Sequence, residues 1–357
     1  MSEIKNSIML NYSCKIWFTA LLTLVASVAG SFSGQTLLAE QPEISVSIVS
    51  ADGRTAYFGG EETMLTYRCT SSSPIKGQLR WQLATGSRTL ARGQKMIVLD
   101  QDQPTEFQLK IQLPPVREGV IFPTDMAISI VNANEAEVSS LKHRLWLFHE
   151  DPFVARKKWI EELNIKLYDP VGKTRDLFEE AKIPFDNLTN PNVLDDIESG
   201  LLIIGEGVSL KKRRSLPGLL PTLADRGVSV LCLKPIDGEL SFPNRTEQPR
   251  LSRVTFQDYR IIQELDKRLS PNLDVPSSMP GTQFGLKTVS QRGKLKLQVV
   301  DSADAWPWWQ ADYQDQGCLI VCSFGLVEHW NAGPTSRFLL AKIFENIQSP
   351  EPPFNSE

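Results

Sequence analysis

The spacing of apolar residues changes near Asp151-Pro152, and this change constrains the fold more than any other feature of the chain. Before it, apolar and polar residues alternate, as in Leu79–Leu83 (LRWQL), which is typical of strands buried on one face. After it, short unbroken apolar runs such as Leu201–Ile204 alternate with helical patterns. The sequence therefore predicts two domains of different structural class.

Residues 42–150 are predicted to form a β-sandwich of the immunoglobulin-like or fibronectin-like kind. About seven one-sided strands follow one another, separated by turn signals such as Gly59-Gly60 and Pro114-Pro115. Cys69 and Trp81 fall where such domains often place a core cysteine and tryptophan. The next cysteine is Cys232, so no cross-sheet disulfide can form within the domain, and we interpret both residues as core.

The region 165–348 is predicted to be an α/β domain, joined to the sandwich by a linker helix in 151–164. Unbroken apolar runs indicate strands buried on both faces, and the helices between them indicate a mainly parallel, flavodoxin-like sheet. The expected strands are Ile165–Tyr168, Leu201–Ile204, Val228–Leu233, Leu295–Val299 and Cys318–Cys322, with helices at Leu216–Arg226, at Gln257–Leu269 and after Pro334.

The first residues have the features of an export signal. Lys5 and Lys15 precede the apolar run Ile16–Ala29, which at about 14 residues is short of the roughly 20 that span a bilayer. Small residues at Ser27–Ala29 suit a signal peptidase. We expect a signal peptide in 1–29, a linker in 30–41, a disordered tail in 349–357, and a periplasmic or extracellular protein; an uncleaved membrane anchor is the alternative.

Composition argues against several partners and cofactors. A formal net charge of -4 provides no field for nucleic acid. The chain has three histidines and no CxxC or HxxxH spacing, so neither a metal site nor another cofactor is predicted. Cys318 and Cys322 would lie about 13 Å apart on one strand, beyond disulfide reach, and we expect buried thiols.

Three stretches resemble a known family: LLIIGEG at 201–207, VSVLCLKP at 228–235 and the segment Ala305–Leu340. Their order is similar to the class I glutamine amidotransferase-like fold. The last stretch more closely resembles amidotransferase-like domains attached to exported bacterial glycoside hydrolases of the β-galactosidase superfamily, in which a Gly-initiated apolar strand precedes an acidic turn, a proline and a Leu-rich helix. The resemblance spans Tyr168–Glu357 and implies a polysaccharide, or a carbohydrate-processing protein, as partner.

Active amidotransferases carry their nucleophile in a G-x-C-x-G elbow, because larger residues would clash in the strained turn. By strand order the elbow corresponds to Val230–Lys234, where Val230 and Lys234 replace both glycines. The residues around Cys322 also lack the flanking glycines, and Glu328-His329 replaces the expected H-x-E. The resemblance therefore implies a pseudoenzyme.

Two groups of site residues remain as candidates. Glu206, Cys322 and His329 are weak catalytic candidates near the carboxyl edge of the sheet. The cluster Trp306, Trp308, Trp309 and Tyr313 offers either aromatic platforms for a sugar or packing against the fold.

Together these features predict an exported, non-catalytic binding or assembly protein associated with polysaccharide processing. The alternatives are a secreted hydrolase with its site at the carboxyl edge of the α/β sheet, and a structural protein of the cell envelope.

Overall fold

A computed structural model describes residues 45–241, 251–273, 284–291, 294–302, 305–314 and 317–348. The predicted signal peptide, linker and tail therefore lie outside the described residues. Within these ranges, no helix is long and apolar enough to cross a membrane.

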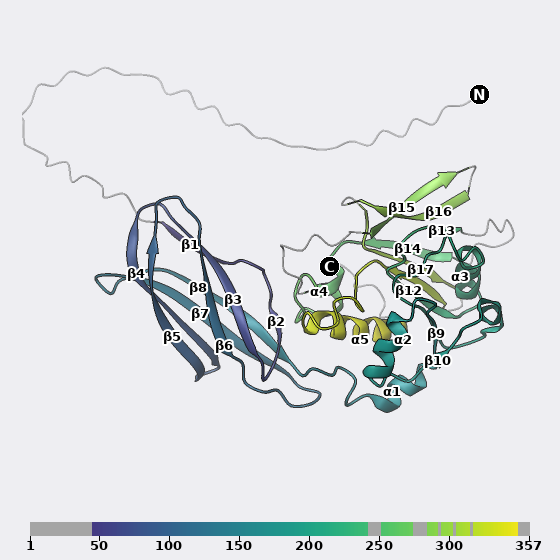
Figure 1. The fold of residues 1–357 in the computed structure, drawn as a ribbon, viewed down its shortest axis with the longest axis horizontal. Helices are drawn as coiled ribbons and strands as arrows, with labels where there is room; N and C mark the ends of the chain where they lie inside the picture. Colours follow the sequence, from purple (N-terminus) through teal and green to yellow (C-terminus); the bar gives the residue numbers. More distant parts are fainter. Residues whose placement is uncertain are drawn as a thin grey trace, which may run out of the picture. The chain divides into compact units, whose positions relative to one another are not determined.

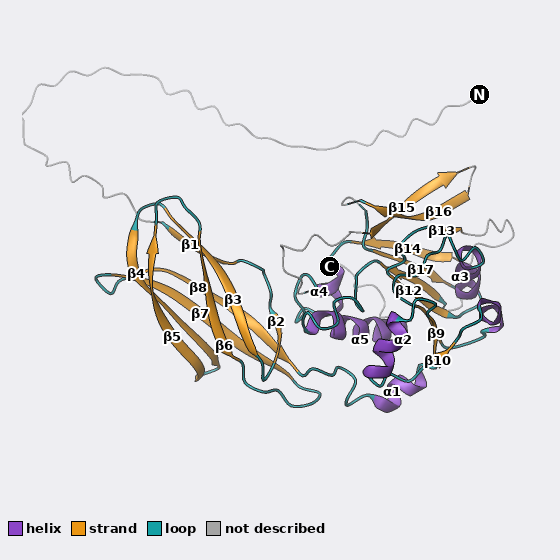
Figure 2. Cartoon of the chain, viewed as in Figure 1, coloured by secondary structure: helices purple, strands orange, loops and turns teal. Residues whose placement is uncertain are grey.

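Within the described residues 45–148, the chain forms two β-sheets and no helix (Figure 2). The three-stranded sheet has the order β1-β3-β6, and the five-stranded sheet has the order β2-β8-β7-β4-β5. Neighbouring strands are antiparallel except β2 and β8. The strands are β1 (Val46–Ser50), β2 (Ala56–Phe58), β3 (Glu62–Ser71), β4 (Ile75–Thr85), β5 (Arg88–Leu99), β6 (Thr105–Gln112), β7 (Ile121–Asn132) and β8 (Glu137–Phe148).

The core of the sandwich follows the alternation of the sequence. Leu79 and Leu83 of β4 are fully buried, whereas Gln82 between them is exposed. Cys69 is a free, buried cysteine, and Trp81 packs, half-buried, against the same core. The indole of Trp81 lies over Gly93 of β5, where a Cβ atom would be 2.6 Å from Cζ2 of the ring.

The C-terminal part is built on a seven-stranded sheet with the order β10-β9-β11-β12-β18-β17-β14 (Figure 1). The strands are β9 (Ile165–Tyr168), β10 (Asp186–Asn187), β11 (Leu201–Ile204), β12 (Ser229–Leu233), β14 (Leu251–Gln257), β17 (Trp308–Tyr313) and β18 (Cys318–Cys322). The five strands that are neighbours in the order β10-β9-β11-β12-β18 run parallel to one another. Counted along the chain, these five have the spatial order 2-1-3-4-5, which is the flavodoxin-like order. The prediction of a β-sandwich followed by a mainly parallel α/β sheet is confirmed.

Each face of this sheet packs against its own layer. Ile203 belongs to the core cluster that contains residues of α2 and α5, and its neighbour Ile204 to the cluster that contains residues of α3. A small antiparallel sheet, β13-β16-β15, joins the α3 side. The remaining elements are α1 (Lys157–Glu162), α2 (Lys173–Glu180), the 3₁₀ helix Pro191–Asp196, α3 (Leu216–Asp225), β13 (Glu239–Ser241), α4 (Ile261–Leu265), β15 (Phe284–Gln291), β16 (Lys294–Asp301) and α5 (Pro334–Gln348).

The predicted helix Gln257–Leu269 is wrong over much of its length. Gln257 is the last residue of β14, and the helix α4 is limited to Ile261–Leu265. The alternating sequence of β14 hydrogen-bonds to β17, which runs antiparallel to both β14 and β18. Pairing with β17 accounts for Gln257 alone. Around α4, the carboxylates of Asp258 and Asp266 accept the N–H groups two residues further on, and Asp266 has an extended backbone, so the helix is confined between two turns.

Candidate functional site

The carboxyl ends of the parallel strands are the first place to look for a site, because doubly wound sheets bind ligands there. The strand order reverses between β9 and β11, so the residues after these two strands, Asp169 and Gly205-Glu206, flank the switch point. Lys234 follows β12 and Ser323 follows β18 at the same edge.

The carboxylate of Asp169 accepts hydrogen bonds from the backbone of its own chain. One carboxylate oxygen accepts the N–H groups of Val171 and Gly172, at 3.1 and 3.0 Å, and the other those of Thr174 and Arg175, at 2.7 and 2.9 Å. The side chain thus caps the first turn of α2. The next turn packs so closely on it that a Cβ at Gly205 would lie 2.5 Å from Cγ of Asp169.

Glu206 is also satisfied internally. It is 4% exposed, and its two carboxylate oxygens accept the N–H groups of Val327, at 2.8 Å, and Glu328, at 3.2 Å. Its own N–H donates to Oγ1 of Thr174 at 2.8 Å. Burial raises the pKa of Glu206, although the hydrogen bond from Val327 and the charge of Lys234 oppose that shift. Glu206 therefore holds the turn after β18 in place and does not present its carboxylate to solvent.

Three ionisable side chains converge above this turn. A Cβ at Gly325 would lie 3.1 Å from both Oε2 of Glu328 and Nζ of Lys234, and 3.2 Å from Cδ2 of His329. The Lys234 ammonium donates a hydrogen bond to Oε2 of Glu328. The side chain of Lys234 is only 12% exposed, whereas that of Glu328 is 51% exposed.

His329 is partly buried within this cluster. Burial lowers its pKa, the charge of Glu328 raises it, and the charge of Lys234 lowers it further. The pKa of His329 therefore lies below its ordinary value, and the imidazole lies beside a Lys-Glu ion pair.

The thiols of the α/β sheet do not join this cluster at the surface. Cys232 and Cys322 are both fully buried. Burial raises the pKa of Cys232 to about 12 and raises the pKa of Cys322 still further above its ordinary value. Because the thiolate is the nucleophilic form, neither cysteine supplies a reactive sulfur to solvent at neutral pH.

The structure separates the members of the tryptophan cluster. Trp308 and Trp309 are each 1% exposed and pack in the core clusters on opposite faces of the sheet. Tyr313 is buried as well, whereas Trp306 is 43% exposed and its ring lies 6.0 Å from that of Phe256. Of these four aromatic residues, Trp306 alone exposes enough of its ring for a ligand to reach.

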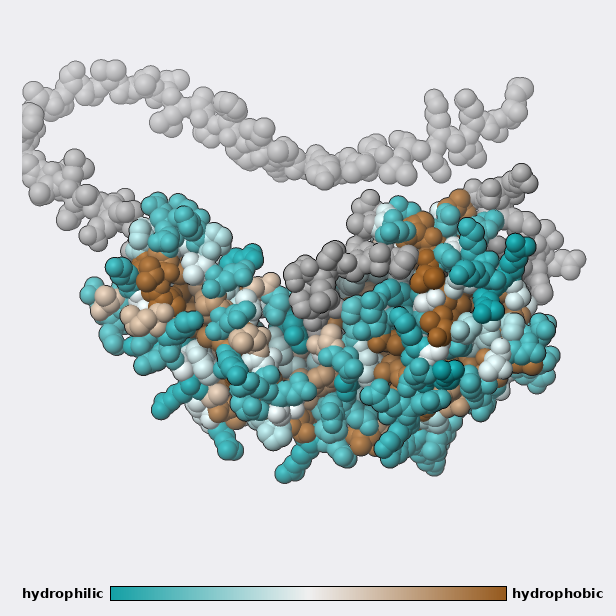
Figure 3. All heavy atoms as spheres, in the orientation of Figure 1, coloured by the Kyte–Doolittle hydropathy of each residue, from teal (hydrophilic) through white to brown (hydrophobic). Residues whose placement is uncertain are grey.

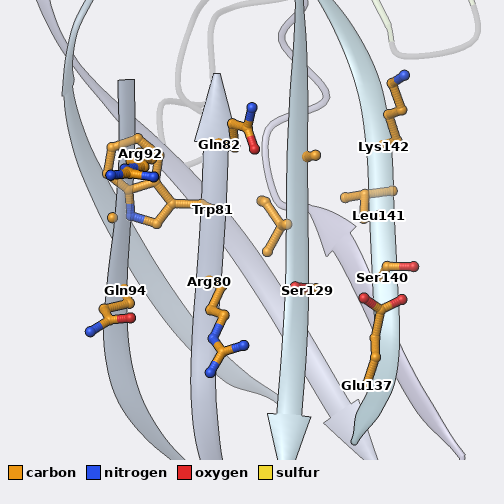
Figure 4. A pocket seen from close by; sticks show the side chains of 13 residues that line it. Arg80, Trp81, Gln82, Arg92, Gln94, Ser129, Glu137, Ser140, Leu141 and Lys142 are labelled. Carbon is orange, nitrogen blue, oxygen red and sulfur yellow. The ribbon is translucent and has the colours of Figure 1, made fainter. Parts of the chain in front are cut away.

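A second candidate site, which the sequence did not single out, lies on the five-stranded sheet of the sandwich. It is an open trough with a volume of about 810 Å³ that extends over four strands (Figure 4). We call it the sheet trough. Its polar lining comes from β4 (Arg80 and Gln82), β5 (Arg92 and Gln94), β7 (Ser129) and β8 (Glu137, Ser140 and Lys142).

The strand register arranges this lining in two rows across the sheet. One row is Gln94-Arg80-Ser129-Ser140, and the next is Arg92-Gln82-Ala127-Lys142. Since Leu79 and Leu83 on either side of Arg80 and Gln82 point into the core, both rows lie on the outer face of the sheet. Three strand spacings of about 4.8 Å give each row a length of about 14 Å.

Much of the hydrogen-bonding capacity of the trough is unused. Arg80 donates to Gln78 at 2.7 Å, and Gln82 to Thr89 at 2.7 Å. Within the described part of the chain, no side-chain hydrogen bond or ion pair engages Arg92, Gln94, Ser129 or Ser140. The trough is therefore a surface of available donors and acceptors.

The sequence alone could predict only part of this site. The alternation in β4 showed which residues face away from the core, but polar residues on an outer face are also typical of a solvated surface. The rows exist only once the register of four strands is known. Elsewhere, the face in Figure 3 is mainly hydrophilic, with hydrophobic residues in separate patches.

Comparison with known proteins assigns no family. No family model matches the chain, and no curated protein matches it. Similar solved structures include fibronectin(III)-like modules of Clostridium thermocellum CbhA (12% identity, 29% of this chain and 97% of that chain, TM-score 0.19). A family 123 glycoside hydrolase from Clostridium perfringens is also similar (10% identity, 54% of this chain and 38% of that chain, TM-score 0.23). So is a cycloisomaltooligosaccharide glucanotransferase from Paenibacillus sp. (9% identity, 71% of this chain and 34% of that chain, TM-score 0.27). The similar regions thus span little more than a third of either enzyme.

Proposed function

We propose that the protein is an exported, non-catalytic binding or assembly protein associated with polysaccharide processing, and that the sheet trough is its binding surface. The observation that carries the proposal is the pair of polar rows across β5, β4, β7 and β8, in which no described residue engages the side chains of Arg92, Gln94, Ser129 and Ser140.

A polysaccharide suits this surface for physical reasons. Sites for small molecules are enclosed, whereas the sheet trough is open, and arginine, glutamine and serine side chains line it beside apolar residues such as Trp81 and Leu141. A sugar chain presents hydroxyl groups along an extended backbone, and these hydroxyl groups can both donate to and accept from such side chains. An open trough also lets the chain continue past both ends.

The α/β part supports a binding or assembly role in a different way. Its strand order agrees with the resemblance to amidotransferase-like domains of exported glycoside hydrolases. At its carboxyl edge, Asp169 and Glu206 bond to the chain's own backbone, and Cys322 is sealed from solvent. The N-terminal segment, with the features of an export signal, would bring the protein to polysaccharides outside the cytoplasm.

The test is glycan binding by the chain without residues 1–29, first on an array and then by titration with the glycans found. We expect the double variant Gln94→Ala/Ser129→Ala to weaken binding about tenfold, since it removes two unengaged polar groups from one row. Gln108→Ala, an exposed glutamine on β6 of the other sheet, is the matched control and should bind as the wild type does. No glycan bound, or equal affinity of the double variant and the wild type, would refute the proposal.

A second candidate is a secreted hydrolase acting at the carboxyl edge. The observation in its favour is the convergence of Lys234, Glu328 and His329 on Gly325. Glycoside and ester substrates with chromogenic leaving groups test it. Hydrolysis that disappears in His329→Gln would support this function, and wild-type chain without hydrolytic activity would exclude it for those substrates.

A further inference from the structure

The charge of the sheet trough is opposite in sign to that of the whole chain. Its lining contains three cations, Arg80, Arg92 and Lys142, and one carboxylate, that of Glu137. At its margin Arg80 pairs with Glu135, and Lys142 and Arg144 pair with Asp125, so one positive charge remains in excess. The full chain has a formal net charge of -4. A local excess of positive charge on an acidic protein indicates a ligand of negative charge.

The cations are distributed along the trough. Arg92 and Lys142 are the two ends of one row, and Arg80 lies in the neighbouring row on the second strand. Positive charges therefore recur over a length of about 14 Å, taken as three strand spacings. This distribution fits a polymer that carries repeated charges better than a single small anion.

These cations are available for exchange with a ligand. No described residue pairs with the Arg92 side chain. Arg80 reaches Glu135 at 3.3 Å and Lys142 reaches Asp125 at 4.0 Å, and both pairs are solvent-exposed on the cationic side. Exposed ion pairs contribute little to stability, so a ligand carboxylate can replace Glu135 beside Arg80, or Asp125 beside Lys142, at small cost.

We infer that the sheet trough takes an anionic polysaccharide that bears carboxylate groups, that is, a uronate polymer, laid across β5, β4, β7 and β8. This inference rests on the proposed function and adds the chemical class of the ligand. Arginine is the side chain best suited to bind a carboxylate, because its planar fork donates two parallel hydrogen bonds. The glutamine and serine side chains of the rows would bind the sugar hydroxyls between the charges.

The experiment compares uronate polysaccharides (polygalacturonate, alginate and hyaluronan) with the same polymers after chemical reduction of their carboxyl groups. Binding to the chain without residues 1–29 is measured by calorimetry at low and high salt. We expect at least one acidic polymer to bind about tenfold more tightly than its reduced form, and this advantage to shrink as salt screens the charges. Arg92→Gln and Lys142→Gln should each remove part of the advantage, while binding of the reduced polymer stays the same.

Arg117→Gln is the matched control, because Arg117 is an exposed arginine that does not line the trough. Equal binding of acidic and reduced polymers, with loss of both in Gln94→Ala/Ser129→Ala, would overturn the uronate inference and leave the proposed function standing. An acidic preference that survives both charge variants, or equal binding of polyglutamate, would also overturn it. Failure to bind any glycan would remove the proposed function and the inference together.

Discussion

Replacing Gly205 by alanine is a direct test of how tightly the switch point of the α/β sheet is packed. The new Cβ would lie 2.5 Å from Cγ, 2.6 Å from Oδ1 and 2.7 Å from Cβ of Asp169, closer than real Cβ atoms approach other atoms. Asp169 cannot turn aside without loosening its four hydrogen bonds to the start of α2. Either the strand end or the helix cap must move.

The expected cost has two parts. Forcing a methyl group into a packed site costs about 1–3 kcal/mol. Partial loss of a helix cap adds about 1 kcal/mol. We therefore expect Gly205→Ala to lower the free energy of unfolding by about 2–4 kcal/mol, a large fraction of the roughly 5–15 kcal/mol of a typical domain.

Urea unfolding followed by tryptophan fluorescence measures this free energy. Gly218→Ala is the control, because nothing lies within 4 Å of its added Cβ, and alanine within α3 should stabilise the chain by about 0.5–1 kcal/mol. In an Asp169→Gly background, Cγ, Oδ1 and Cβ of residue 169 are all absent, and Gly205→Ala should cost less than about 1 kcal/mol. If Gly205→Ala is as stable as the wild type, or lowers the free energy of unfolding equally in both backgrounds, then Asp169 does not obstruct the new Cβ.

Three further predictions concern the candidate residues of the α/β part. Trp308→Ala should cost about 3–5 kcal/mol by removing a fully buried side chain, whereas Trp306→Ala should cost less than about 1 kcal/mol; chemical denaturation measures both, and equal costs would contradict the burial described. Because the folded pKa of Glu206 is raised, its protonation stabilises the fold fully below the unfolded pKa, and this contribution is lost as pH rises through the folded pKa. The free energy of unfolding of the wild type should therefore fall as pH rises between the unfolded and the folded pKa, and this fall should be absent in Glu206→Gln. The variant should itself be destabilised by about 1–3 kcal/mol, because an amide N–H replaces one acceptor. The same pH profile in the wild type and in Glu206→Gln would count against a raised pKa of Glu206. Ellman's reagent should leave the four buried thiols of a Cys14→Ser variant unmodified until denaturant is added; these are Cys69, Cys232, Cys318 and Cys322. Modification under native conditions would show that at least one of them is accessible.

Local periodicity was sufficient to predict the fold class. Two-residue alternation in segments such as Leu79–Leu83, and unbroken runs such as Leu201–Ile204, each reflect the environment on both sides of a strand. The same logic failed at Gln257, where β14 ends, because its hydrogen-bonding partner β17 is distant in the sequence.

The burial and the contacts of the candidate residues depend on strand pairing and on residues far apart in the sequence. Trp308 and Trp309 begin a strand, so successive side chains point to opposite faces and both become core, which a Pro-interrupted loop would not do. Glu206 was identified from the turn after its strand, but its bonds to Val327 and Glu328 join residues more than 120 positions apart. The rows of the sheet trough likewise require the register of four strands, which alternation within one strand cannot provide.

Chemical footprinting with a bound glycan locates the binding surface on the protein. Phenylglyoxal modifies accessible arginines, and mass spectrometry locates each modified residue. We expect a bound polysaccharide to protect Arg80 and Arg92 of the sheet trough and to leave Arg117 as reactive as before. Saturating glycan that leaves Arg80 and Arg92 fully reactive would contradict the assignment of the trough as the binding surface.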